Sequence, residues 1–305
     1  MRLRHAISWG SLGLCGLLVT GEIGVRVLGM VDFPLFAVDE EIGYVPKPNQ
    51  RGCFLNRRCW VFNDYSMGTT AAWSPNAHTN ILLIGNSIVM GGDHFDQPER
   101  LGPLLQTKLG DGFAVWPIAS NGWTNVNEIV YFERHPDVLA RANCVVWEFM
   151  RGGLSSRTPW AGQYVWPEER PLWALGYVLR RFILPRLFHI DTHELPMQGA
   201  PDPRNLANFE ATLARFARDT DGAHPDILFL YPDKEQLRLA RSGGEWLPER
   251  RDLERLARQY HFKLVDIASY AQWTESLYRE ETHPGTEGNR VLADILSTAI
   301  RESQQ

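Results

Sequence analysis

The stretch ILLIGNSIVMGG, residues 81–92, decides the fold and raises a question about Ser87. Its apolar start is typical of a buried parallel strand, and Gly-Asn-Ser follows where that strand ends. In α/β sheets, active sites lie at the carboxyl ends of the strands. Ser87 is therefore either a nucleophile or a polar residue of an ordinary turn, and the remainder of the chain must supply a base, an acid and oxyanion donors.

Further apolar runs of strand length follow along the chain, and amphipathic segments of helical period separate them. The runs are 81–85, 113–119, 143–149, 225–232 and 262–267. The intervening and closing segments are 98–110, 124–135, 205–220, 249–260 and 286–300. Strands that alternate with helices predict an α/β sandwich with a parallel sheet.

Length and charge limit the class of protein. The chain has 305 residues and a formal net charge of −5, so it is long enough for one large domain and is not expected to bind nucleic acid. No phosphate-binding glycine motif follows the first strand, and no CxxC or HExxH spacing predicts a metal. No cofactor is expected.

Residues 1–30 differ from the rest of the chain. Arg2 and Arg4 precede an uncharged apolar run over 6–21, which Glu22 ends. A spanning helix needs roughly 20 apolar residues, which this segment reaches only with Glu22 at the far interface. We expect a transmembrane signal anchor with an exported (periplasmic or extracellular) catalytic domain; a cleaved signal peptide and a buried helix are the alternatives.

The anchor precedes two regions without clear periodicity. Residues 31–80, rich in Pro and Gly, predict an extended arm before a catalytic domain over 81–305. An insertion at about 154–203 places arginines among large apolar residues. It suits a lid, a segment on a membrane surface, or a helix pair with a solvated basic face. In an exported chain, Cys53 and Cys59 of the arm can form a short disulfide loop.

His283 is the candidate base for Ser87. It lies in a loop before the last helix, and Glu280 and Glu281 precede it by three and two residues. A carboxylate that contacts the imidazole fixes its tautomer and stabilises the imidazolium, and either glutamate is near enough in sequence. Gly122, just after the second strand, is a candidate donor of an oxyanion N–H.

Together, Gly-Asn-Ser at 85–87, Gly122, and Glu-x-x-His-Pro at 280–284 resemble the SGNH/GDSL hydrolase superfamily. The apolar N-terminus and arm also resemble its membrane-anchored members. The resemblance implies a flavodoxin-like three-layer sandwich with a five-stranded parallel sheet and no cofactor. It implies that Ser87 is the nucleophile, His283 the base and Glu280 the acid, and that the N–H groups of Ser87 and Gly122 bind the oxyanion.

The chain departs from the family pattern in three places. Asn86 replaces the usual Asp, and the acid is Glu instead of Asp. The Asn that normally follows the third strand and donates to the oxyanion is absent, because VVWEF leads into MRGGLSS. Arg151 is a candidate substitute donor.

The VVWEFMR run resembles SGNH-like proteins that acetylate bacterial exopolysaccharides. Their Asp-Thr-His motif is similar to Glu281-Thr282-His283, which would make Glu281 the acid, although Glu280 is favoured by the Pro after His283. A second triplet, Asp-Thr-His at 191–193, is interpreted as coincidence. We expect a serine esterase or acyltransferase acting on an ester or an acylated cell-envelope carbohydrate. The alternative is a non-catalytic SGNH-like polysaccharide-binding protein.

Overall fold

The computed structural model describes residues 2–76, 79–188, 202–219 and 225–302. Its centre is a five-stranded sheet with the order β6-β5-β7-β8-β9, in which every neighbouring pair is parallel. The strands are β5 (Asn80–Gly85), β6 (Ala114–Ala119), β7 (Cys144–Phe149), β8 (Ile227–Leu230) and β9 (Lys263–Asp266). This is the flavodoxin-like strand order, and it confirms the predicted α/β fold with a parallel sheet.

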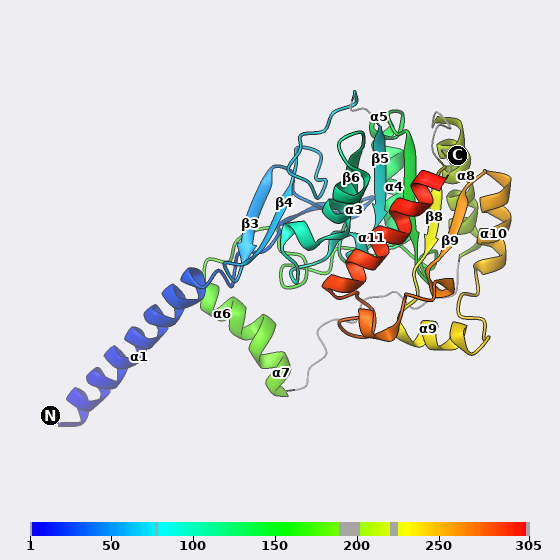
Figure 1. Ribbon diagram of the computed structural model, residues 1–305. Coiled ribbons are helices and arrows are strands. Elements are labelled where there is room, and N and C mark those ends of the chain that lie inside the picture. The colour runs from blue at the N-terminus through cyan, green and yellow to red at the C-terminus, as the bar shows by residue number, and fades with distance from the viewer. Residues whose placement is uncertain (1, 77–78, 189–201, 220–224, 303–305) are drawn as a thin grey trace.

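Helices cover both faces of the sheet (Figure 1). On one face α3 (Leu101–Leu109) packs against α11 (Thr286–Arg301). On the other face α8 (Pro203–Asp219) lies beside α4 (Asn125–Arg134) and is bonded through Glu210 to α10 (Arg250–Gln259). The three inner strands β5, β7 and β8 are buried along their length because both faces are covered, which explains their continuous apolar sequences.

Shorter helices occupy the connections. They are α2 (Ser87–Met90), α5 (Pro136–Leu139), α9 (Lys234–Arg241) and the 3₁₀ turns Gln97–Glu99, Ile267–Ser269 and Glu275–Leu277. The carboxyl ends of β5 and β6 and the long loop after β9 meet at one edge of the sheet, where the predicted site residues lie.

The segment predicted as an extended arm, 31–80, is folded onto the body. It forms two antiparallel hairpins, and several of its aromatic side chains join the main core. The strands are β1 (Phe36–Asp39), β2 (Gly43–Pro46), β3 (Gln50–Phe54) and β4 (Arg58–Phe62). Cys53 and Cys59 face each other across the β3–β4 hairpin and form a disulfide.

Helix α1 (Arg2–Val27) projects from the body and joins it only near its C-terminal end (Figure 1). Glu22 accepts hydrogen bonds from the N–H groups of Ala174 and Leu175, at the start of α6 (Ala174–Val178). Within the described residues, no helix is sufficiently long and apolar to traverse a bilayer. The transmembrane anchor expected over 1–30 is therefore not supported; its uncharged run, 6–21, is shorter than a span requires.

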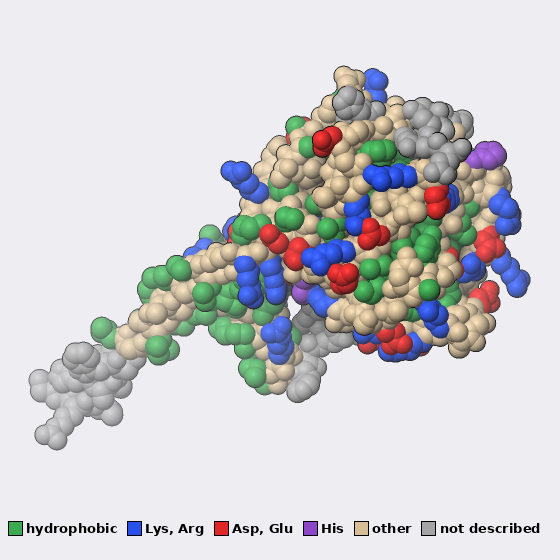
Figure 2. Space-filling view, viewed as in Figure 1, with side chains coloured by type: hydrophobic (Ala, Val, Ile, Leu, Met, Phe, Trp, Pro, Cys, Tyr) green, Lys and Arg blue, Asp and Glu red, His purple; other side chains and the backbone are tan. Residues whose placement is uncertain are grey.

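The described part of the insertion, up to residue 188, continues from α6 through the π-helical turn Leu179–Ile183 into α7 (Leu184–Phe188). Its inner side packs against the end of α1 in a small second core, which includes Val25, Phe33 and Tyr177. Large apolar side chains remain exposed on α1 and on the α6–α7 segment, beside arginines (Figure 2). The rest of the insertion, 189–201, lies outside the described residues.

Candidate active site

Ser87 lies at the first position of α2, immediately beyond β5. Asn86 caps this short helix, because its Oδ1 accepts the N–H of Ile88 at 2.9 Å. The N–H of Asn86 in turn donates to Oε2 of Glu148 on the neighbouring strand β7, at 3.1 Å. The turn that presents Ser87 is thus fixed from both sides. The Asn that departs from the family pattern serves as the helix cap.

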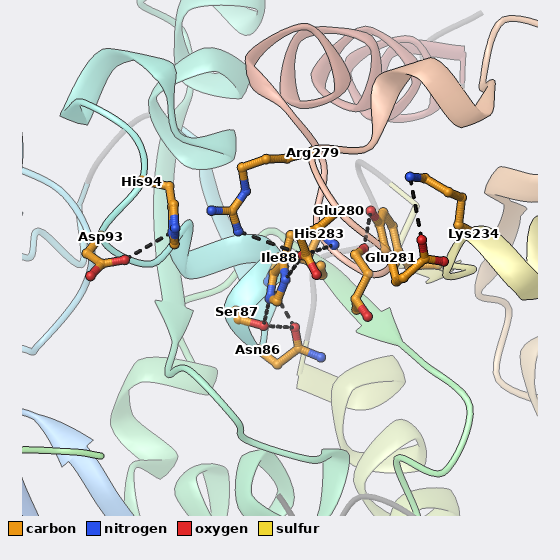
Figure 3. Close-up of polar contacts among 12 residues, drawn as sticks. Asn86, Ser87, Ile88, Asp93, His94, Lys234, Arg279, Glu280, Glu281 and His283 are labelled. Carbon is orange, nitrogen blue, oxygen red and sulfur yellow. Dashed lines mark hydrogen bonds and ion pairs between the residues drawn. The ribbon is translucent and has the colours of Figure 1, made fainter. Parts of the chain in front are cut away.

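His283 lies beside Ser87 although 196 positions separate them. Its Nε2 is 2.8 Å from Oγ of Ser87 (Figure 3). The loop that carries His283 is closed by hydrogen bonds from the Arg279 N–H to His283 O (2.9 Å) and from the Gly285 N–H to Leu277 O (2.7 Å). The 2.8 Å between His283 Nε2 and Ser87 Oγ is a separation at which a hydroxyl can pass its proton to an imidazole.

Glu280 is the carboxylate that contacts His283. Its Oε1 accepts the backbone N–H of His283 at 2.8 Å and also bonds Nδ1 of the ring. The hydrogen bond from His283 lowers the pKa of Glu280 to about 2 despite partial burial. A carboxylate on Nδ1 holds the proton there, so Nε2 is left to accept the Ser87 hydroxyl.

Glu281 points elsewhere. Its carboxylate is largely exposed and lies 3.9 Å from Nζ of Lys234, while its carbonyl oxygen accepts the Lys234 N–H at 2.9 Å (Figure 3). Of the two glutamates that the sequence left as alternatives, only Glu280 is hydrogen-bonded to the imidazole. The second Asp-Thr-His triplet, 191–193, lies outside the described residues.

Two backbone N–H groups adjoin the site. Ser87 begins α2, and Gly122 lies in the turn after β6 with a φ of 78°. Within the ranges that the structure describes, neither N–H is hydrogen-bonded to a protein acceptor. Arg151 is exposed in the turn after β7, and in the same ranges no hydrogen bond or ion pair joins it to Ser87, Gly122 or His283. Both N–H groups thus lack a protein acceptor in these ranges, and Arg151 is bonded to none of the predicted site residues there.

A pair of buried carboxyl groups lies behind the Ser87 turn. They belong to Glu128 and Glu148. Asn125 Nδ2 donates to the carboxyl Oε2 of Glu128 and to the backbone carbonyl oxygen of Glu148, both at 2.8 Å. Trp147 Nε1 also donates to Glu128, at 2.6 Å. Burial raises the pKa of Glu128 to about 7. Burial, and then the charge of Glu128, raise the pKa of Glu148 well above its ordinary value.

Sequence reasoning missed these carboxyl groups, although one signal was present. A charged residue inside the apolar run VVWEF is unusual for a strand buried on both faces. Figure 3 also shows a separate contact of 3.0 Å between Nδ1 of His94 and Oδ1 of Asp93. Among the described residues, no three His, Cys, Asp or Glu side chains gather as metal ligands would.

Comparison with protein-family models and with curated proteins finds no match. Solved structures do match. One is a protein of the G-D-S-L family from Desulfitobacterium hafniense, with 14% identity, 72% of this chain and 99% of that chain covered, and a TM-score of 0.42. The chain is similar to SGNH/GDSL hydrolases.

Two further solved structures are similar to this chain. LAE5, an alpha/beta hydrolase from a Lake Arreo metagenome, has 17% identity and a TM-score of 0.46, over 75% of this chain and 97% of its own. The M. smegmatis aryl esterase has 16% identity and a TM-score of 0.42, over 73% of this chain and 99% of its own. All three TM-scores lie below 0.5, so the function proposed below depends on the geometry of the site.

Proposed function

We propose that the protein is an SGNH/GDSL-type serine hydrolase of carboxylic esters. The observation that carries this proposal is the contact of 2.8 Å between His283 Nε2 and Ser87 Oγ, with Glu280 on the opposite ring nitrogen. A nucleophile, a base and an orienting acid in hydrogen-bonded series are the components of acyl transfer through serine. A binding module would need none of these contacts.

The reaction follows from the positions of the protons. His283 Nε2 takes the proton of Ser87 as Oγ attacks the ester carbonyl, and the N–H groups of Ser87 and Gly122 bind the resulting oxyanion. The carbon–oxygen bond to the leaving alkoxide then breaks, and that alkoxide receives the proton from Nε2. This leaves an acyl group on Ser87. Water gives a proton to Nε2 and attacks the acyl carbon. The bond between that carbon and Ser87 Oγ then breaks, Oγ takes the proton back from Nε2, and the carboxylic acid is released.

The proposal that the protein is a serine hydrolase is tested with a serine-reactive fluorophosphonate. We expect the wild-type chain to be labelled, Ser87→Ala to take no label, and His283→Ala to be labelled at least 100-fold more slowly. Labelling that persists in Ser87→Ala would mean that another serine is the nucleophile.

A transferase variant of the same chemistry differs only in the nucleophile that reaches the acyl-enzyme. In this alternative a carbohydrate hydroxyl takes the place of water as the acceptor, and the resemblance of VVWEFMR to SGNH-like acetyltransferases of exopolysaccharides supports it. The test supplies p-nitrophenyl acetate with oligosaccharides and measures acetylated sugar by mass spectrometry. Release of free acetate alone, at every oligosaccharide concentration, would show a hydrolase instead.

The location proposed for the catalytic domain is outside the cytoplasm, at a membrane. The Cys53–Cys59 disulfide supports an oxidising compartment, and the exposed apolar side chains of α1 and the α6–α7 segment support a membrane contact (Figure 2). Fractionation of cells, combined with thiol alkylation before and after reduction, tests both points. Recovery of the chain in the soluble cytoplasmic fraction with both thiols free would contradict them.

The alternative to an enzyme is a non-catalytic relative that binds polysaccharide. It is favoured by one observation, the absence of an amide donor after β7, where Arg151 makes no contact with the site residues in the described structure. Removing one oxyanion donor costs about 3–4 kcal/mol in a serine protease. Failure of the wild-type chain to react with the fluorophosphonate, together with binding of a polysaccharide, would favour this alternative.

A further inference from the structure

The turn after β6 has two possible arrangements. The Trp123 N–H donates to Ser120 O at 3.2 Å, and Gly122, at the third position of this turn, has a φ of 78°. These values are those of a type II turn. A type I turn of the same four residues would need a negative φ at Gly122, which glycine adopts equally well. The two types differ in the direction of the Asn121–Gly122 peptide.

The Asn121–Gly122 peptide contains the N–H assigned to the oxyanion. In a trans peptide the C=O and N–H bonds point in opposite directions, so a partner that holds the oxygen of Asn121 also fixes the N–H of Gly122. That partner is Tyr44, whose hydroxyl donates to Asn121 O at 2.6 Å across 77 positions of the chain. A bond of this kind also polarises the peptide and strengthens its N–H as a donor.

Tyr44 is itself fixed on several sides. Its side chain is fully buried, and its ring stacks on Trp166 with the ring centroids 4.0 Å apart. Trp123, the next residue of the turn, donates from Nε1 to Tyr44 O at 2.8 Å. Asn127 Nδ2 binds the neighbouring Ile42 O at 2.6 Å. Tyr44 belongs to the β1–β2 hairpin, which precedes the parallel sheet in sequence.

The turn adjoins the helix that carries Ser87. The Asn121 N–H contacts Sδ of Met90, the last residue of α2, at 3.2 Å. A sulfur atom is a weak acceptor. The Asn121 N–H belongs to the preceding Ser120–Asn121 peptide. For the Asn121–Gly122 peptide, the hydrogen bond found among the described residues is the one from the Tyr44 hydroxyl to Asn121 O.

We propose that Tyr44 is a positioning residue, which selects the turn orientation in which the Gly122 N–H can bind the oxyanion. This inference rests on the proposed function, since it concerns the same reaction. It assigns the N-terminal hairpin a part in forming the site. Without the hydroxyl, the Asn121 oxygen loses its partner and the type I orientation becomes accessible.

The test is Tyr44→Phe, which keeps the stacked ring and removes only the hydroxyl. Loss of a whole oxyanion donor lowers kcat by about 10²–10³, so partial misorientation should lower it about 10-fold. We expect this loss in kcat with p-nitrophenyl acetate, with KM within about twofold of wild type. Tyr177→Phe is the matched control, because Tyr177 is also buried and hydrogen-bonded but lies in α6.

Two results distinguish this inference from the proposed function. An inactive wild-type enzyme would contradict the proposed function, whereas an active wild type with a Tyr44→Phe kcat within twofold would overturn the inference. A crystal structure of Tyr44→Phe gives a readout without activity: a negative φ at Gly122 is expected, and an unchanged type II turn would count against it. If Tyr44→Phe folds poorly, Gly122→Ala tests the same turn, because alanine disfavours the positive φ.

Discussion

Oε2 of Glu148 accepts the backbone N–H of Asn86 at 3.1 Å, so a buried carboxyl group on β7 holds the turn that presents Ser87. Here the side chain crosses from one parallel strand to the next, and it is completely buried while doing so. The turn that presents Ser87 therefore depends on a carboxyl group whose pKa burial raises well above its ordinary value.

We expect Glu148→Ala to lower kcat at least 10-fold and Glu148→Gln to retain activity within about threefold. Alanine leaves the Asn86 N–H buried without an acceptor, which costs about 1–3 kcal/mol, whereas the glutamine amide oxygen can accept that N–H in place of Oε2. Steady-state kinetics and thermal unfolding of both variants check this. Equal loss of kcat in the two variants would show that the carboxyl group itself is needed, and not merely an oxygen that accepts the Asn86 N–H.

The buried carboxyl pair also makes stability depend on pH. Unfolded Glu128 loses its proton near its ordinary pKa of 4.5, but folded Glu128 keeps it until about 7. Between these values the folded state binds the extra proton, so the free energy of unfolding falls as pH rises. The rise in the pKa from 4.5 to about 7 corresponds to about 3 kcal/mol at most. The raised pKa of Glu148 likewise lowers the free energy of unfolding as pH rises.

Urea unfolding between pH 5 and pH 8 measures this effect. We expect Glu128→Gln to flatten the decrease in stability over this range, because the amide cannot ionise. Glu133→Gln, on the exposed side of the same helix, is the control and should keep the wild-type slope. The low pKa of Glu280 affects stability only at pH values below this window. A wild-type stability that rises from pH 5 to pH 8 would contradict the assignment.

The parallel sheet was predictable because its signal is local. An apolar run such as ILLIG contains the whole reason that β5 is a buried strand, and the spacing of five such runs fixes the fold class. The pairing of Ser87 with His283 was predictable only through the motifs of a known superfamily. No local property relates residues so far apart.

The positions of Tyr44 and Glu148 were not predictable for the same reason. The hairpin strand that contains Tyr44 is four residues long and lies in a Pro- and Gly-rich segment, so its sequence resembles an extended arm. Its contact with Asn121 exists only after the hairpin has packed on the body. The choice between Glu280 and Glu281 likewise depended on the loop geometry, which hydrogen bonds of Arg279 and Gly285 determine.

Glu280→Gln should lower kcat about 100-fold or more, and Glu281→Gln should leave it within about twofold. Glu280 bonds the imidazole, and replacing such an acid by an amide permits the wrong tautomer. Glu281 differs from it by one position, has the same charge and faces Lys234, so it is a matched control. Kinetics with p-nitrophenyl acetate compare the two. A larger loss of kcat in Glu281→Gln would instead indicate that Glu281 is the acid, as the resemblance to the exopolysaccharide acetyltransferases implies.

Gly85 is required by the same contact that holds the Ser87 turn. A Cβ at Gly85 would lie 2.1 Å from Oε2 of Glu148 and 2.6 Å from Cγ2 of Val89, in a region with no free space. Gly85→Ala should therefore destabilise the fold by about 2–3 kcal/mol, as overpacked cores do, and should displace Glu148 from Asn86. Gly112→Ala is the control, because its Cβ would meet no atom within 4 Å. Thermal unfolding compares the two, and equal melting temperatures would mean that β5 and β7 are less closely packed than described.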